Sequence, residues 1–312
     1  MQLTHEMLDR LDQLEKKYGA MGQDMQSYLD GLLYADYLTY WDYIHLDTLL
    51  SLQNARTPIP DERIFIIYHQ ITELYFRLIL DAIEQLGAEE NLEINFFKRQ
   101  IRRMNTYFEQ LIQSFDIMVE GMDKDEFLRF RMSLLPASGF QSVQYRQIEF
   151  SSTDLRSLVH HSRRSELTPD ADFQTVYQDL YWRFGATELA TGKKTLTLRQ
   201  FEQKYSKSLL DLASRMRTQN VNQCFQKLPD ADRQDTELVQ LLRQYDFNAN
   251  VQWRLAHYRS AIRYLERKPQ TIAATGGTNW QEYLPPKNQR ILFFPQLWTE
   301  EEFENWGRKT KM

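Results

Sequence analysis

The sequence predicts an all-α protein. Gly and Pro, which interrupt helices, number only 11 and 9 among 312 residues, whereas long unbranched side chains are abundant. Apolar residues also recur three and four positions apart through most of the chain, and this spacing places them on one face of a helix. Since a chain of this length can bury a substantial core, we expect one helical domain over residues 1–312.

The N-terminal half is expected to form long helices with one marked break. An amphipathic helix should run to about Lys17, and a second apolar-rich stretch covers 27–52. The break is NARTPIPD at 54–61, and its last residue, Asp61, is a plausible N-cap because a carboxylate accepts backbone N–H bonds. Further helices are expected at 62–86, 92–120 and 123–131.

The C-terminal half is more interrupted. Pro136 and Gly139 break the pattern before a helix resumes at 141–149. Residues 151–207 are polar and irregular, which predicts a small helical insert covering the main bundle. Helices are expected again at 209–224 and 235–265. The segment 268–286, with the only Gly-Gly pair, is a candidate for a mobile lid.

Composition excludes several kinds of partner and site. The net charge of −5 is spread without long runs of one sign, which argues against nucleic acid. Cys224 is the only cysteine, so neither an intrachain disulfide nor a thiolate metal cluster can form. No apolar run approaches membrane-spanning length, and the N-terminus lacks the pattern of a secretory signal. We therefore expect a soluble cytoplasmic protein without a membrane partner.

His69 lies on an apolar helix face. Phe65, His69 and Glu73 are spaced at i, i+4 and i+8, and the apolar residues of that face draw the imidazole into the interior. Desolvation there lowers the pKa of an imidazole and keeps it neutral. Two interpretations are open: a histidine satisfied within the core, or a group that hydrogen-bonds or deprotonates a substrate N–H.

Arg131 precedes a turn of small residues. It follows Phe127 by one helical turn, and the segment PASG at 136–139 could bring the Ser138 hydroxyl and backbone N–H groups close to it. A guanidinium binds a carboxylate through two parallel hydrogen bonds, which orients the ligand as well as holding it. The alternative is an arginine that caps a helix and pairs with a neighbouring glutamate.

His257 follows Trp253 by one helical turn. Haem iron commonly takes a proximal histidine from such a helix, with aromatic side chains packing on the porphyrin. The motifs of zinc proteases, P-loop enzymes, dinucleotide-binding folds and serine hydrolases (HExxH, P-loop, GxGxxG and GxSxG) do not occur.

Together these segments resemble the tryptophan 2,3-dioxygenase family, haem-dependent all-α enzymes that open the indole ring of L-tryptophan. The resemblance runs from about residue 31 to 298 and is weakest over 151–207 and 266–290. The segments that carry it are LTYWDYIHLDTLLSLQ (38–53), FIIYHQITELYFRLIL (65–80), FRMSLLPASGFQSVQYRQIEF (130–150), WRLAHYRSAIRYL (253–265) and FFPQLW (293–298).

The resemblance implies a helical-bundle fold around haem b and a role for each candidate residue. His257 matches the proximal iron ligand, and Trp253 lies on the same helix. His69 matches the distal histidine near the indole N–H, and Phe65 the aromatic residue that packs on the substrate. The remaining matches are Arg131 with the residue that binds the substrate carboxylate, Phe127 with a position held by Tyr or Phe, and Ser138 and Gly139 with the loop beside dioxygen.

The family also forms homotetramers. Tyr40 and Tyr43 match tyrosines that reach into a neighbouring subunit's pocket, which implies an N-terminal arm over residues 1–45. A family loop whose threonine contacts the substrate ammonium corresponds to ATGGT at 274–278, with Thr275 as the preferred match. This loop lies further from His257 than is usual, and Thr271 is nearer the usual offset but lacks the flanking glycines.

The implied reaction inserts both atoms of dioxygen across the indole C2–C3 bond of L-tryptophan and gives N-formyl-L-kynurenine. Three alternatives are open. The first is a haem-dependent oxygenase or hydroxylase of the same superfamily that acts on another aromatic amino acid or an indole derivative. The second is a non-catalytic haem-binding protein, and the third is a structural helical bundle.

Overall fold

The computed structural model describes residues 3–36, 38–135, 137, 139–168, 171–187, 192–267, 270–271, 281 and 284–308. The chain divides into two compact units, residues 1–54 and 55–312, and each is considered by itself. The boundaries expected from the sequence, an arm over 1–45 and an insert over 151–207, stay predictions.

The first unit consists of four helices with extended segments between them. They are α1 (His5–Ala20), α2 (Met25–Tyr34), α3 (Tyr40–Tyr43) and α4 (Leu46–Leu50). Thr4 and Asp24 cap α1 and α2 by accepting backbone N–H bonds. The apolar stretch at 27–52 does not form one continuous helix as its spacing suggested. The backbone is extended at Ala35 and adopts the left-handed helical conformation at His45, and both positions end helical segments. No residue of these four helices is buried.

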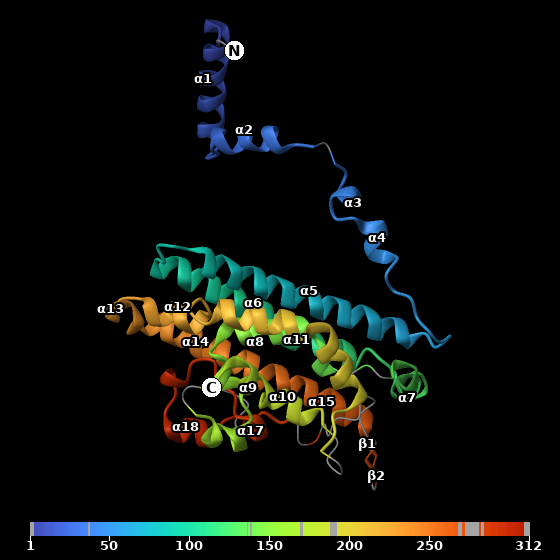
Figure 1. Ribbon diagram of the computed structural model, residues 1–312. Coiled ribbons are helices and arrows are strands. Elements are labelled where there is room, and N and C mark those ends of the chain that lie inside the picture. The colour runs from blue at the N-terminus through green and yellow to red at the C-terminus, as the bar shows by residue number, and fades with distance from the viewer. Residues whose placement is uncertain are drawn as a thin grey trace. The chain divides into compact units, whose positions relative to one another are not determined.

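The second unit is built on two long helices, α5 (Asp61–Ala88) and α6 (Ile94–Val119), which lie side by side (Figure 1). The sequence predicted both helices within a few residues, because each carries apolar residues at three- and four-residue spacing. On α6 this spacing produces one buried face, whose apolar members are Phe97, Ile101, Met104, Phe108, Leu111, Phe115 and Met118.

The start of α5 differs from the prediction. Asp61 is the first residue of the helix and Pro60 occupies the N-cap, so the predicted capping role of Asp61 is wrong. Its carboxylate instead accepts a hydrogen bond from the Asp123 backbone N–H at 2.6 Å. Asp61 therefore ties the start of α5 to the N-cap of α7 (Lys124–Phe130).

The middle of the chain is made of shorter helices. The prediction of one helix at 209–224 was wrong. α11 begins much earlier, where the Thr195 side chain caps it, and a second helix starts after the Asn220 cap. The elements of this region are η1 (Arg131–Leu134), η2 (Gly139–Gln141), α8 (Val143–Ser152), η3 (Leu155–Leu158), η4 (His161–Glu166), α9 (Phe173–Gln178), α10 (Tyr181–Gly185), α11 (Leu196–Met216), α12 (Val221–Lys227) and α13 (Asp230–Arg233).

The helix predicted at 235–265 is present as three consecutive parts. α14 (Thr236–Phe247) passes through a π turn, η5 (Asn248–Gln252), into α15 (Trp253–Leu265). Both α14 and α15 pack against α6. The C-terminal elements are the antiparallel pair β1 (Glu266–Arg267) and β2 (Gln270–Thr271), then α17 (Pro286–Gln289), η6 (Pro295–Leu297) and α18 (Glu300–Glu304).

The all-α prediction is confirmed, since the paired strands have only two residues each. Within the described ranges, no helix combines the length and apolar character that crossing a membrane requires. The lid predicted at 268–286 lies for the most part outside the described residues.

Candidate active site

One cavity of about 340 Å³ brings His69 and His257 together. Its wall comes from α5, α6, α7, α8, α10 and α15, and its volume is in the range of small-molecule sites. Most of the lining residues are apolar, and many of them carry planar aromatic rings. The aromatic residues that line it are Phe65, Tyr68, Phe76, Phe115, Phe127, Phe140, Tyr145, Tyr181, Trp253 and Tyr264.

The His69 imidazole is held in one orientation. Its Nδ1 lies 2.7 Å from the Phe65 carbonyl oxygen, and because a carbonyl can only accept, Nδ1 must be the donor. His69 is exposed to solvent, so the expected interior position is wrong. The surrounding protein nevertheless desolvates the ring and lowers its pKa, against smaller raising effects of the Phe65 hydrogen bond and the Glu73 charge, so the ring is neutral at neutral pH. A neutral imidazole that donates through Nδ1 leaves Nε2 as a hydrogen-bond acceptor. The Phe65 ring packs on it, with 4.1 Å between ring centroids.

The His257 imidazole is also neutral. Burial, and secondarily repulsion from the charge that His69 would carry when protonated, lower its pKa from 6.5 to about 4. Its ring lies 5.9 Å from Phe115 and 6.5 Å from Trp253, measured between centroids. A neutral imidazole keeps the lone pair with which it can bind a metal. Among the described residues, no three His, Cys, Asp or Glu side chains gather to hold a metal ion.

Gly139 lies directly against His257. A Cβ atom at position 139 would be 3.1 Å from Cε1 and 3.7 Å from Nε2 of the imidazole. The first distance is shorter than an ordinary van der Waals contact, so only glycine leaves the imidazole where it is. The turn at 139–141 and the helix α15, far apart in the sequence, therefore meet at this histidine.

Six of the candidate residues line this cavity: Phe65, His69, Phe127, Gly139, Trp253 and His257. Arg131 is buried but is not among the lining residues, and burial lowers the pKa of its guanidinium. Its predicted binding of a carboxylate stays a prediction.

Four other candidates, together with Thr271 as the alternative to Thr275, cannot be placed at the cavity. Tyr40 and Tyr43 belong to the first unit, where they are 70% and 74% exposed. Ser138 and Thr275 lie outside the described residues, and Thr271 falls in β2. The roles expected for these residues stay predictions.

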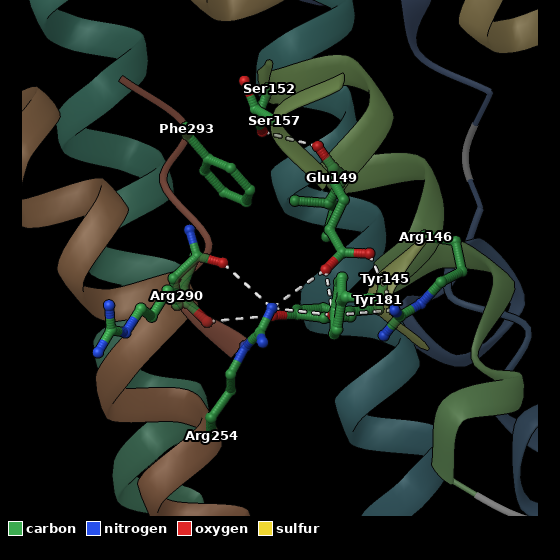
Figure 2. Close-up of polar contacts among 12 residues, drawn as sticks. Tyr145, Arg146, Glu149, Ser152, Ser157, Tyr181, Arg254, Arg290 and Phe293 are labelled. Carbon is green, nitrogen blue, oxygen red and sulfur yellow. Dashed lines mark hydrogen bonds and ion pairs between the residues drawn. The ribbon is translucent and has the colours of Figure 1, made fainter. Parts of the chain in front are cut away.

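The sequence did not reveal a buried charged cluster in the cavity wall. Arg146 and Arg254 approach the Glu149 carboxylate from opposite sides, as Figure 2 shows, with N–O distances of 2.9 and 3.3 Å. The Tyr181 hydroxyl donates to Glu149 and accepts hydrogen bonds from both arginines, at 3.0 and 2.8 Å. All four side chains are buried. We call Arg146, Glu149, Tyr181 and Arg254 the arginine cluster.

The sequence contained only weak signals for this cluster. Arg146 and Glu149 are three residues apart, a spacing that ordinarily indicates an exposed ion pair on a helix surface. Arg254 lies three residues before His257 and so shares its helix face, and this position was the one available signal.

Comparison with known proteins agrees with this geometry. Residues 30–224, more than half of the chain, match the family model described as tryptophan 2,3-dioxygenase. The chain belongs to the tryptophan 2,3-dioxygenase family. A tryptophan 2,3-dioxygenase from Exiguobacterium sibiricum is 30% identical over 274 residues, which cover 84% of this chain and 91% of the relative.

Two further members of the tryptophan 2,3-dioxygenase family show similar agreement. The protein from a Polaromonas species is 30% identical over 84% of this chain and 86% of its own length. That from Bordetella pertussis is 28% identical over 89% of this chain and 94% of its own length. The match therefore extends well beyond the segments around the two histidines, and the expected family is confirmed.

Proposed function

We propose that this chain is a haem-dependent dioxygenase that inserts both atoms of dioxygen across the indole C2–C3 bond of L-tryptophan, giving N-formyl-L-kynurenine. The observation that supports this most is the pair of neutral imidazoles, His69 and His257, in one aromatic cavity of a chain that belongs to the tryptophan 2,3-dioxygenase family. The chain is an oxidoreductase of this family.

The residues of the cavity fit haem b. An iron porphyrin needs a neutral imidazole, flat apolar walls and a cation for its carboxylates. His257 provides the first, the aromatic lining the second and the arginine cluster the third. His257 would hold the iron, and Trp253, Phe115 and Gly139 surround that imidazole. When bound, haem supplies the binding and activation of dioxygen.

The chain's own residues position the substrate. His69 Nε2, as an acceptor, can take a hydrogen bond from the indole N–H, and Phe65 and Phe127 can pack against the ring. The apolar lining excludes water from the reacting carbons and strengthens polar interactions within the cavity. Holding the two reactants in place is the main contribution that such a site makes to the rate.

The remaining roles rest on the family resemblance. We propose that Arg131 binds the substrate carboxylate, that Ser138 and Gly139 lie beside dioxygen, and that Thr275 contacts the ammonium group. We further propose a cytoplasmic homotetramer in which Tyr40 and Tyr43 of the N-terminal arm reach a neighbouring subunit's cavity. Their exposure in the isolated chain is compatible with that role.

Purified protein with haem and a reductant provides the test. Addition of L-tryptophan in air should produce the ultraviolet absorbance of N-formylkynurenine, and the protein should carry a Soret band. A Soret band without turnover of L-tryptophan, but with oxidation of tyrosine or a substituted indole, would favour the related oxygenase reaction. A protein that cannot be reconstituted with hemin would contradict the proposal.

A further inference from the structure

A second cleft, of about 610 Å³, shares no described lining residue with the cavity of His69 and His257. We call it the C-terminal cleft. The elements η3 and η4 contribute two arginines to it, and the segment from 292 to 303 contributes most of its apolar side chains. Its lining residues are Arg156, Ser157, Arg164, Leu167, Leu292, Pro295, Trp298, Thr299, Glu300 and Phe303. The proposed reaction uses none of these residues.

Backbone carbonyls hold the Arg164 guanidinium in the cleft wall. Its Nε donates to the Val159 carbonyl at 3.0 Å. Its Nη2 donates to the carbonyls of Ser157 and Arg290, at 3.2 and 2.9 Å. The remaining nitrogen, Nη1, makes no hydrogen bond to the described part of the chain and is accessible to solvent. A fixed guanidinium therefore keeps two N–H groups for a ligand, and it needs little further ordering to bind one.

No carboxylate among the described residues forms an ion pair with Arg164. The acids beside it in sequence and space, Glu166 and Asp179, pair with Arg163 instead. Glu300 is the one acid in the lining of the C-terminal cleft, and it is exposed and makes no ion pair with the arginines of the lining. Because carbonyl oxygens are dipoles without net charge, the three bonds of Arg164 leave its positive charge unbalanced.

The groups around Arg164 experience this positive charge. Burial, and secondarily the charge of Arg290, lower the pKa of Arg164 to about 10, so the guanidinium stays charged at neutral pH. Burial and the charges of the same two arginines lower the pKa of His161. The pKa of His160 falls to about 4, through burial and then through His161 and Arg164. Like charges at close range raise the free energy of the site, and a bound anion would relieve this repulsion.

The C-terminal segment gives the cleft an aromatic wall. The Trp298 ring is fixed, because its indole N–H donates to the Asp246 carboxylate at 3.0 Å and the Arg243 guanidinium lies 4.0 Å from its centroid. Pro295 and Phe303 extend the apolar surface beside it. A planar apolar ring packs well on such a surface, while a carboxylate matches the N–H pair of a guanidinium.

We propose that the C-terminal cleft binds an aromatic carboxylate that has no ammonium group. Arg164 Nη1 donates to the carboxylate, and Trp298 and Phe303 pack against the ring. An α-amino acid is disfavoured, because its ammonium group would lie near the unbalanced charges of Arg164 and Arg290. The ligand is therefore not the substrate of the proposed reaction, and the site stands independently of that reaction.

Three brominated indoles test the charge selectivity on the wild-type full-length protein. They are 5-bromoindole-3-propionate, its neutral amide, and 5-bromo-L-tryptophan, which adds the α-ammonium group. Crystals soaked with each compound locate the bromine by its anomalous scattering, and calorimetry gives the dissociation constants of the acid and the amide. The propionate should place its bromine in the C-terminal cleft, and 5-bromo-L-tryptophan should not. The amide should bind there about tenfold more weakly, because it lacks the negative charge.

Two arginine variants of one helix test the role of the guanidinium. Arg164→Gln should weaken binding of the propionate about tenfold and remove its bromine from the cleft. Arg163→Gln is the matched control, because Arg163 also lies in η4 and is half-buried, but is paired with Glu166 and Asp179 and does not line the cleft. It should leave the dissociation constant of the propionate unchanged.

Several results would overturn the site. Bromine from the propionate in the cavity of His69 and His257 alone is one, and equal affinity of wild type and Arg164→Gln is another. Equal binding of acid and amide in the wild-type cleft would also exclude it, and this comparison does not depend on the folding of any variant. A protein that binds the propionate in the cleft but takes up no hemin would support the site while contradicting the proposed function.

Discussion

His69 and His257 line one cavity, and the hydrogen bonds of His69 decide which of its ring nitrogens is available there. The Nδ1–H of His69 is committed to the Phe65 carbonyl, so only Nε2 can meet a substrate. We predict that His69→Ala keeps haem and slows turnover. The loss in kcat should be about tenfold if the imidazole only accepts a hydrogen bond, and about a hundredfold or more if it removes the proton. His257→Ala should lose the haem itself.

The visible spectrum and the turnover number separate the two roles. His69→Ala should retain the full Soret absorbance per chain, and His257→Ala should show little of it even with excess hemin. Retention of haem and activity in His257→Ala would disprove its assignment as the iron ligand. His161→Ala, at an exposed histidine of η4 outside the cavity lining, is a control that should alter neither quantity.

The absence of a side chain at Gly139 leaves room for the imidazole of His257. A methyl group there would lie 3.1 Å from Cε1, so in Gly139→Ala the ring must shift by a few tenths of an ångström. We predict faster haem loss, measured as hemin transfer to an excess of apomyoglobin, with little change in the thermal midpoint of the apoprotein. Gly87→Ala is the control, because its added methyl would meet only the Gln219 carbonyl at an ordinary 3.7 Å. Equal haem loss in both variants would refute the prediction.

Single residues were predictable where a helical repeat fixed their neighbours. Phe65 and His69 were expected on one helix face, and both line the cavity. Arg146, Glu149 and Arg254 were not found, because a charged residue at helical spacing resembles a solvated surface position. Only the packing of α8 against other helices shows that they are buried. The hydroxyl that bonds both arginines belongs to Tyr181, which lies far from Arg146 and Arg254 in the sequence.

At the scale of elements, the join between α14 and α15 was the least predictable feature. Periodicity indicated a continuous helix over 235–265 but contained no sign of the π turn at 248–252. The π turn depends on distant partners: the Tyr145 hydroxyl donates to the Ala249 carbonyl at 3.0 Å, and Asn248 donates to Asn105 at 3.2 Å. Such turns are frequent at functional sites, and this one carries Asn250, which holds Arg254.

Asp246 fastens the C-terminal segment to α14. Its carboxylate accepts N–H bonds from Phe293, Phe294 and the Trp298 indole, yet burial outweighs them and raises its pKa from 3.8 to about 6. A group with a raised pKa binds its proton more tightly in the folded state. Its contribution to stability is therefore present below pH 4 and is lost as the pH rises to about 6.

We accordingly predict that wild type loses stability relative to Asp246→Asn between pH 4 and pH 7, by on the order of 2–3 kcal/mol. Urea unfolding of both proteins at the two pH values gives this difference directly. Asp211→Asn, at an exposed position of α11, should show no such change with pH. A constant difference between wild type and Asp246→Asn across the range would show that burial does not raise this pKa.

At the scale of the whole molecule, the helical class, the long helices and the two-histidine site were predictable from spacing, composition and family resemblance. The arrangement of residues 151–207 was not, because its short helices begin at single capping side chains such as Asp172 and Thr195, and apolar periodicity does not reveal them. A break at 54–61 and an N-terminal arm over 1–45 were expected. The exposure of every helical residue of the first unit was not, because residues 1–54 have the same helical spacing as the rest of the chain.

The first unit has the surface of a segment that associates with another chain. Leu32, Leu33 and Tyr34 are each more than 70% exposed, and Tyr40, Trp41 and Tyr43 continue this apolar surface along the sequence. Exposed apolar patches of this kind mark association surfaces.

We therefore predict that light scattering gives a mass several times the 37.5 kDa of one chain. Leu33→Glu should lower that mass, because it places a charge where apolar contact is expected. Leu196→Glu makes the same change in α11, outside the first unit, and should leave the mass unaltered. A wild-type mass equal to one chain would contradict the assembly.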